Sequence, residues 1–156
     1  MNKKGEGGSI SSFGVSHSYN NRLYLAPALN NQLIYGYSAD YSLFKLNEAG
    51  FPDLIFKKDI PSQSISKQEK DDIIKGIRDS ISGRGQKWPE GVIEEACQFP
   101  AHRPFFSGFA TDDKGRIYVR KIMSVLAETE SLEFDIFSSE GYYLYKTVLP
   151  FSPRVI

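Results

Sequence analysis

The stretch FATDDKGRIYVRK, residues 109–121, contains the residues best suited by type to bind a cation or a phosphate. Asp112 and Asp113 are adjacent carboxylates, followed by Lys114 and Gly115. A calcium site takes about six to eight oxygens from acids at alternate positions, which this stretch lacks. Asp also accepts hydrogen bonds from turn amides, and Gly tolerates a positive φ. We therefore predict a β-hairpin turn here, shaped by the two aspartates.

The residue types for nucleophilic catalysis are sparse. The chain has one cysteine, Cys97, and two histidines, His17 and His102. A catalytic pair needs its histidine beside the nucleophile, oriented by a third group. Cys97 and His102 are five positions apart across a proline, so we interpret them as a structural cysteine and a loop histidine. The sequence predicts no catalytic residue, no metal ligand and no cofactor.

Loop residues are better candidates for binding. The stretch GRGQKWPEG, residues 83–91, lacks the Gly-Lys-Ser/Thr ending of a phosphate loop and follows a predicted helix, so it is interpreted as a helix stop and linker. Tyr, Trp and Arg are the residue types that dominate partner contacts. The predicted ligand- or partner-binding residues are Trp88, Lys87, His102, Arg103 and Tyr41.

The elements that must position these residues are mostly strands. Short aromatic and branched runs separated by turn residues predict strands over residues 22–61 and again over 105–150. Between them, Ser66 and Glu69 have capping-box spacing, isoleucines follow at helical spacing, and Gly83 is a natural stop. We predict a helical insertion at about 66–97, a loose segment at 1–18, and an all-β unit over 19–156.

The two β regions are similar to each other. LIYGYSADYSLFKLNEAGFPDLIFKKDIP and RIYVRKIMSVLAETESLEFDIFSSEGYYLYKTVLP both run from an Ile-Tyr strand to a proline. When Gly50 is aligned with Gly141, Leu43 matches Phe134, Leu46 matches Phe137 and Phe51 matches Tyr142. This repeat predicts sheets of about four strands, and radial repetition of such sheets is typical of a β-propeller.

These motifs resemble blades of the six-bladed β-propellers, particularly the NHL-like and TolB-like extracytoplasmic proteins of Bacteroidetes. TDDKGRIYVRK, LEFDIFSSEGYYLYKTVLP and YSLFKLNEAGF carry the resemblance, which covers roughly residues 30–150. It implies a partial propeller of about two to three blades, corresponding to the C-terminal portion of such a protein. An incomplete ring leaves strand edges and sheet faces uncovered, so we expect self-association or pairing with further blades.

Charge and hydropathy limit the partners. Lys plus Arg equals Asp plus Glu at 19 each, so no basic field is present for nucleic acid. The apolar runs are too short for a membrane span. The N-terminus lacks the apolar core of a signal peptide, whereas the resembled family is mostly periplasmic or surface-exposed; the sequence leaves the localisation undetermined.

The function predicted on these grounds is a non-catalytic binding or scaffold module built of propeller blades. Its ligand is a protein, a small molecule or a carbohydrate. The alternative is a fragment or subunit of a propeller hydrolase or lyase, whose site would be completed by other blades. Such sites gather side chains from several blades, and two or three blades cannot complete one.

Overall fold

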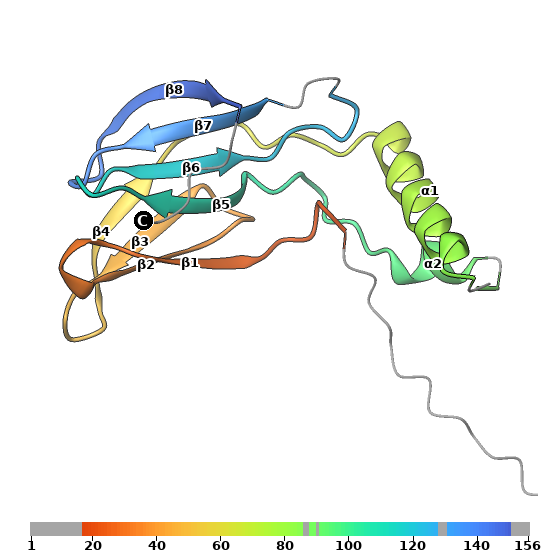
Figure 1. Cartoon of the computed structure of the whole chain (residues 1–156), viewed down its shortest axis with the longest axis horizontal. Coiled ribbons are helices and arrows are strands. Elements are labelled where there is room, and N and C mark those ends of the chain that lie inside the picture. The colour runs from red at the N-terminus through yellow and green to blue at the C-terminus, as the bar shows by residue number, and fades with distance from the viewer. Residues whose placement is uncertain (1–16, 86–87, 90, 128–130, 151–156) are drawn as a thin grey trace, which may run out of the picture.

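A computed structural model describes residues 17–85, 88–89, 91–127 and 131–150, and it has two four-stranded antiparallel sheets. Sheet 1 contains β1 (Leu23–Pro27), β2 (Leu33–Tyr37), β3 (Ser42–Leu46) and β4 (Pro52–Lys57) in that order. Sheet 2 contains β5 (Phe106–Thr111), β6 (Ile117–Lys121), β7 (Leu132–Phe137) and β8 (Tyr143–Leu149). The sheets are stacked, and a 3-10 turn, Leu29–Asn31, joins β1 to β2 (Figure 1). The predicted four-stranded sheets are confirmed.

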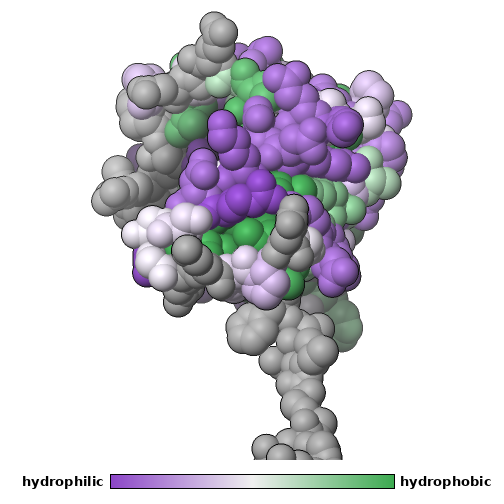
Figure 2. Space-filling model, turned by 90° about the vertical axis from the view of Figure 1, so that its right-hand side faces the viewer, coloured by the Kyte–Doolittle hydropathy of each residue, from purple (hydrophilic) through white to green (hydrophobic). Residues whose placement is uncertain are grey.

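The helical insertion lies between β4 and β5, as predicted. It contains α1 (Lys67–Gly83) and α2 (Val92–Ala96), which pack against each other beyond one end of the sheets (Figure 1). The capping box of Ser66 and Glu69 is present, but α1 includes Gly83, and the positive φ of 73° falls at Gly85. Figure 2 shows that mostly hydrophilic residues cover this end of the molecule.

The second, third and fourth strands pair in the same register in both sheets, whereas the pairing of the first strand is shifted only in sheet 2, between Phe106 and Gly108. Tyr35 pairs with Phe44 in sheet 1, and Val119 pairs with Asp135 in sheet 2. Both sheets have a register irregularity between the third and fourth strands, after Lys45 and after Ile136. The match of Leu43 with Phe134 therefore agrees with the strand pairing. The Ile-Tyr pairs of the two strands are offset by one residue, because pairing with the third strand makes Leu33, and not Ile34, equivalent to Ile117.

The turns between the third and fourth strands also repeat. In sheet 1 the side chain of Asn47 accepts hydrogen bonds from the backbone N–H of Ala49 and Phe51. In sheet 2 the hydroxyl of Ser138 accepts from the residues at the equivalent positions, Glu140 and Tyr142. Gly50 and Gly141 take positive φ values of 79° and 93° in these turns, which non-glycine residues rarely adopt.

The sheets pack head to tail, with non-equivalent faces in contact. Leu43 is buried between the sheets, whereas the equivalent Phe134 lies on the face of sheet 2 that points away from sheet 1. We call these equivalent surfaces the front faces, so the front of sheet 1 packs on the back of sheet 2. The first strands, β1 and β5, contact each other, and Thr111 donates a hydrogen bond to the carbonyl of Pro27 across the contact at 2.8 Å.

The core lies in this contact and is rich in aromatic rings. Phe56 of β4 meets Phe137 of β7 edge to face at 6.2 Å between centroids, and Tyr24 meets Phe106 at 5.7 Å. Aromatic pairs in such orientations add to the stabilisation from apolar burial. The buried members of this core are Ile34, Tyr41, Leu43, Phe56, Phe106, Ile117, Val119 and Phe137.

Two buried carboxylates connect segments that are distant in sequence. Asp135 on β7 is fully buried and accepts hydrogen bonds from the Tyr41 hydroxyl and the Lys58 ammonium, both at 2.7 Å. Burial and the hydrogen bond to Asp135 raise the pKa of Tyr41, and Lys58 also lies 3.9 Å from the ring of Tyr143. Tyr41 directly precedes β3 and Lys58 directly follows β4, whereas Asp135 is on β7, so this network joins the two sheets.

The second buried carboxylate, Glu69, anchors the helical insertion. The hydroxyls of Tyr19 and Ser124 donate to its Oε1 at 2.6 Å, and Arg103 NH2 donates to its Oε2 at 3.2 Å. Burial alone would raise the pKa of Glu69, but hydrogen bonds from Ser124, Tyr19 and Ser66 lower it to about 2. Glu69 therefore connects the N-terminal segment, α1 and the loops before β5 and after β6.

The turn between β5 and β6 is built by Asp112. Its Oδ1 accepts the backbone N–H of Lys114 and of Arg116, and its Oδ2 accepts Arg116 Nε at 2.6 Å. Gly115 takes a φ of 74°. The predicted hairpin is confirmed, but of the two aspartates expected to shape its turn it is Asp112 that accepts the turn hydrogen bonds, whereas the side chain of Asp113 is exposed.

Asp112→Ala is expected to destabilise the protein by about 1–2 kcal/mol, because it removes the acceptor of two turn amides. Asp113→Ala should leave the free energy of unfolding within about 0.5 kcal/mol of wild type. Urea unfolding of the two variants measures both values. Equal effects of the two substitutions would contradict the assignment of the turn to Asp112.

Candidate functional site

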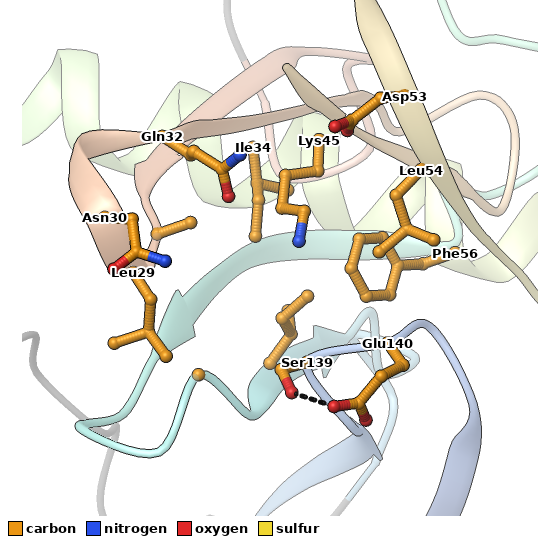
Figure 3. A pocket seen from close by; sticks show the side chains of 13 residues that line it. Leu29, Asn30, Gln32, Ile34, Lys45, Asp53, Leu54, Phe56, Ser139 and Glu140 are labelled. Carbon is orange, nitrogen blue, oxygen red and sulfur yellow. Dashed lines mark hydrogen bonds between the residues drawn. The ribbon is translucent and has the colours of Figure 1, made fainter. Parts of the chain in front are cut away.

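The best candidate for a ligand site is a cleft of about 450 Å³ between the two sheets (Figure 3). The hairpin turns that line it lie at the end of the sheets opposite the helices (Figure 1). This volume lies within the range of small-molecule sites, about 300–1,000 Å³. Its apolar floor comes from the sheet faces and its rim from three hairpin turns. The floor consists of Ile34, Leu54, Phe56 and Ile117; the polar lining includes Asn30, Gln32, Lys45, Asp53, Ser139 and Glu140.

Lys45 is the residue that departs from the packing pattern. It lies on the front face of sheet 1, where Ile136 occupies the equivalent position in sheet 2 and is fully buried. Figure 3 shows the half-buried side chain of Lys45 extending into the cleft between Ile34 and Phe56. Within the described part of the chain, its ammonium makes no hydrogen bond or ion pair. The ammonium is therefore available to donate a charge-assisted hydrogen bond to an anionic group of a ligand.

The turns around the cleft are fixed by local conformation. Asn30 and Asn31 adopt positive φ values of 58° and 57°, which Asn tolerates better than most residues. This conformation brings the carbonyl of Gln32 close to Ala28, whose backbone N–H donates a hydrogen bond to it at 2.8 Å. Across the cleft, a Cβ on Gly115 would lie 2.7 Å from Leu29 Cδ1, so Gly115 allows the two turns to approach closely.

The electrostatics of the cleft are mixed. Ser139 donates to Glu140 at 2.8 Å (Figure 3), and hydrogen bonds from Ser139 and Ser138 lower the pKa of Glu140. The charge of Lys45 contributes to the same lowering. Glu140 and Asp53 are both exposed, whereas Lys45 is half-buried. The positive group is therefore the deeper one, and the negative groups lie toward the solvent.

The residues predicted as a binding site from sequence do not come together. Trp88 lines a separate cavity of about 410 Å³ with Arg78, Ile81 and Ile93 of the helical insertion. Lys87 lies outside the described residues. His102 is exposed, and its backbone forms a bridge to Ser64.

The other two predicted binding residues have structural partners. Tyr41 is buried on Asp135 between the sheets, and Arg103 is bonded to Glu69. Arg103 also lines a third cavity, of about 290 Å³, at the helical end of the sheets. The assignment of these residues to binding stays a prediction.

The other chemically interesting residues have structural settings. His17 stacks on Phe99 at 4.4 Å between ring centroids, and burial lowers its pKa. It lies within the predicted loose segment 1–18, of which residues 1–16 lie outside the described part. Cys97 is buried at the end of α2, and burial raises the pKa of its thiol. Thiols with a raised pKa are poor nucleophiles.

Sequence reasoning missed the cleft because no motif marks it. Its lining comes from segments between Ala28 and Glu140 that meet only in the folded chain. One signal was present: aligning Gly50 with Gly141 sets Lys45 opposite Ile136 in the repeat. A lysine in one copy of a repeat where the other copy has an isoleucine is a usable indicator of a site.

Comparisons with known proteins add no assignment: no family model, no curated protein and no solved structure matches this chain. Among the described residues, no group of three or more His, Cys, Asp or Glu side chains is arranged to hold a metal ion. None of the helices described has the length and apolar character needed to cross a membrane.

Proposed function

We propose that this chain is a non-catalytic binding module built of β-propeller blades. The support is the head-to-tail contact, through the first strands, of two sheets whose other three strands pair in the same register. Radial repetition of four-stranded sheets gives a propeller, and a head-to-tail contact repeated by rotation closes into a ring. The six-bladed arrangement of the resembled family is part of this proposal.

The ligand we propose for the cleft is a small organic monocarboxylate with an apolar body. The observation that carries this choice is Lys45, which replaces the buried isoleucine of the repeat and extends into the cleft with no hydrogen-bond or ion-pair partner among the described residues. The ligand carboxylate binds the ammonium of Lys45, and its apolar part lies on Ile34 and Phe56. The carboxylates of Asp53 and Glu140 at the rim disfavour ligands with a second negative charge.

Benzoate and hexanoate are suitable probes, with benzamide as the uncharged control. Both carboxylates are expected to shift the amide resonances of Ile34, Lys45 and Gly115 with millimolar affinity, and benzamide is expected to bind at least tenfold more weakly. Millimolar affinity corresponds to about 4 kcal/mol, within reach of one ion pair and a small apolar contact.

Lys45→Ile, which installs the residue of the other repeat, is expected to abolish binding of benzoate. The same substitution should raise the free energy of unfolding by about 1 kcal/mol, because it replaces a half-buried ammonium with apolar surface. Lys75→Gln removes one positive charge on α1, far from the cleft, and should change neither quantity. Equal binding of benzoate and benzamide, or benzoate binding retained in Lys45→Ile, would contradict the proposed site.

A further inference from the structure

The back face of sheet 1 is an extended apolar surface with no cover in the described part of the chain. Strand pairing places eight apolar side chains on it, and Tyr35 and Phe44 at its centre stack at 5.1 Å. Leu23, Leu25 and Ile55 are 59%, 60% and 56% exposed. The full set is Leu23, Leu25, Leu33, Tyr35, Tyr37, Phe44, Leu46 and Ile55.

The repeat indicates that this surface is built to be covered by a sheet. In sheet 2 the equivalent back face is covered by sheet 1, and its residues Ile117, Val119 and Phe137 are fully buried. Their equivalents on sheet 1 are Leu33, Tyr35 and Leu46, which are also apolar. At these three positions the back face of sheet 1 therefore has the apolar character of an interface that already exists once in the molecule, and at the adjacent position Phe44 is the equivalent of the buried Asp135.

The exposure of the described residues indicates which face of a second copy can pack on the back face of sheet 1. A head-to-tail continuation would use the front face of sheet 2, but its central residues Phe134 and Ile136 are only 2% and 0% exposed. The back face of sheet 1 is apolar and exposed, and Lys57 brings charge to it only at the end of β4. It is thus complementary to itself.

We propose that two copies of this chain associate through the back faces of sheet 1 in a two-fold dimer. This inference rests on the repeat of the proposed function but not on the ligand cleft, which lies on the opposite, front face. The dimer uses the surface that a preceding blade would cover in a closed ring, so it is an arrangement of the two-sheet chain on its own. Two-fold contacts of this kind are the commonest among homo-oligomers. Four strands about 4.8 Å apart and five residues of about 3.4 Å each give a footprint of about 19 by 17 Å.

The small footprint predicts a weak dimer. About 300 Å² of planar contact is well below the roughly 800 Å² per partner of a standard interface, so we expect a Kd of about 10–100 µM. Sedimentation velocity from 5 µM to 500 µM should show a shift from monomer to dimer. A monomer throughout that range would overturn the proposal.

Leu25→Lys tests the position of the interface, because it puts a charge in the centre of the apolar face. It is expected to weaken association at least tenfold while leaving the circular dichroism spectrum and the melting temperature of the monomer unchanged. The matched control, Val148→Lys, alters a side chain that is 50% exposed on β8 and should leave the dimer intact. Dimerisation unaffected by Leu25→Lys would overturn the proposal.

Thiol labelling distinguishes the two-fold dimer from other arrangements. In a Cys97→Ser background, the labelling rate of Leu25→Cys should fall as protein concentration rises, in step with the dimer fraction. Tyr145→Cys, on the front face of sheet 2 and 47% exposed in wild type, should label at a constant rate. Protection of both cysteines would indicate head-to-tail association and would overturn the two-fold dimer, without bearing on benzoate binding.

Discussion

Replacing Asp135 with alanine is expected to lower the free energy of unfolding by about 3–5 kcal/mol, the range found when one partner of a buried ion pair is removed. Asp135 is fully buried, and the variant leaves the Tyr41 hydroxyl and the Lys58 ammonium without their acceptor. Lys58 is 23% exposed and can recover some hydration, which favours the lower end of this range. Urea unfolding at pH 7 measures the loss.

Two further variants separate the contributions in this network. Asp135→Asn keeps the volume and an oxygen for Tyr41, so it should cost less than Asp135→Ala. Tyr41→Phe removes only the hydroxyl, and combining it with Asp135→Ala should cost less than the sum of the two single changes, because the groups form one network. Additive effects would contradict the role of Asp135 as the shared acceptor between the sheets.

Glu69→Ala is the second substitution with a large expected effect, again about 3–5 kcal/mol, because Arg103 loses its buried partner. The loss of stability should be concentrated in the helical insertion, where Glu69 connects α1 with the loops that contain Arg103 and Ser124. Hydrogen exchange should therefore accelerate in α1 and around Ser124 more than in the sheets. The control is Glu94→Ala: Glu94 pairs with Arg78 on the exposed surface, and such pairs contribute about 1 kcal/mol or less.

The lowered pKa of Glu69 gives this anchor a defined pH dependence. The folded-state pKa is about 2, below the ordinary value of 4.5. A depressed pKa means that the stabilisation is fully present above the unfolded value and is lost as pH falls through the folded value. The wild-type protein should lose this contribution between about pH 4.5 and pH 2, and Glu69→Gln should remove that part of the profile. An unchanged acid profile in Glu69→Gln would contradict the assignment.

Local features of the fold could be predicted from the sequence because they depend on neighbours along the chain. The turn at Asp112 and the capping box of Ser66 and Glu69 each involve residues within four positions. The match of Leu43 with Phe134 follows from an alignment on turn glycines. In contrast, the faces of β8 could not be predicted, because regular alternation would place Tyr143 and Tyr145 on the same face. The register irregularity opposite Ile136 and Phe137 puts these two tyrosines on opposite faces.

The candidate site could not be predicted because long-range packing defines it. Tyr41 reads as an exposed aromatic in a strand pattern, but its partner Asp135 is 94 positions away. The alternation of side chains along a strand separates its two faces, but it does not show which of them is covered. The significance of Lys45 depends on that choice of face, since only a lysine on the packed face is out of place.

The repeat equivalence of the two sheets and their head-to-tail packing are the central claim, because both the Lys45 cleft and the back-face dimer depend on them. Methyl NOE spectra of the Ile- and Leu-labelled protein test this packing most directly. We expect contacts from Ile34 and Leu43 to the ring of Phe106 and the methyl groups of Ile117, and none from Leu25 or Ile55 to sheet 2. Contacts from Leu25 or Ile55 to Ile117 within one chain would contradict the account.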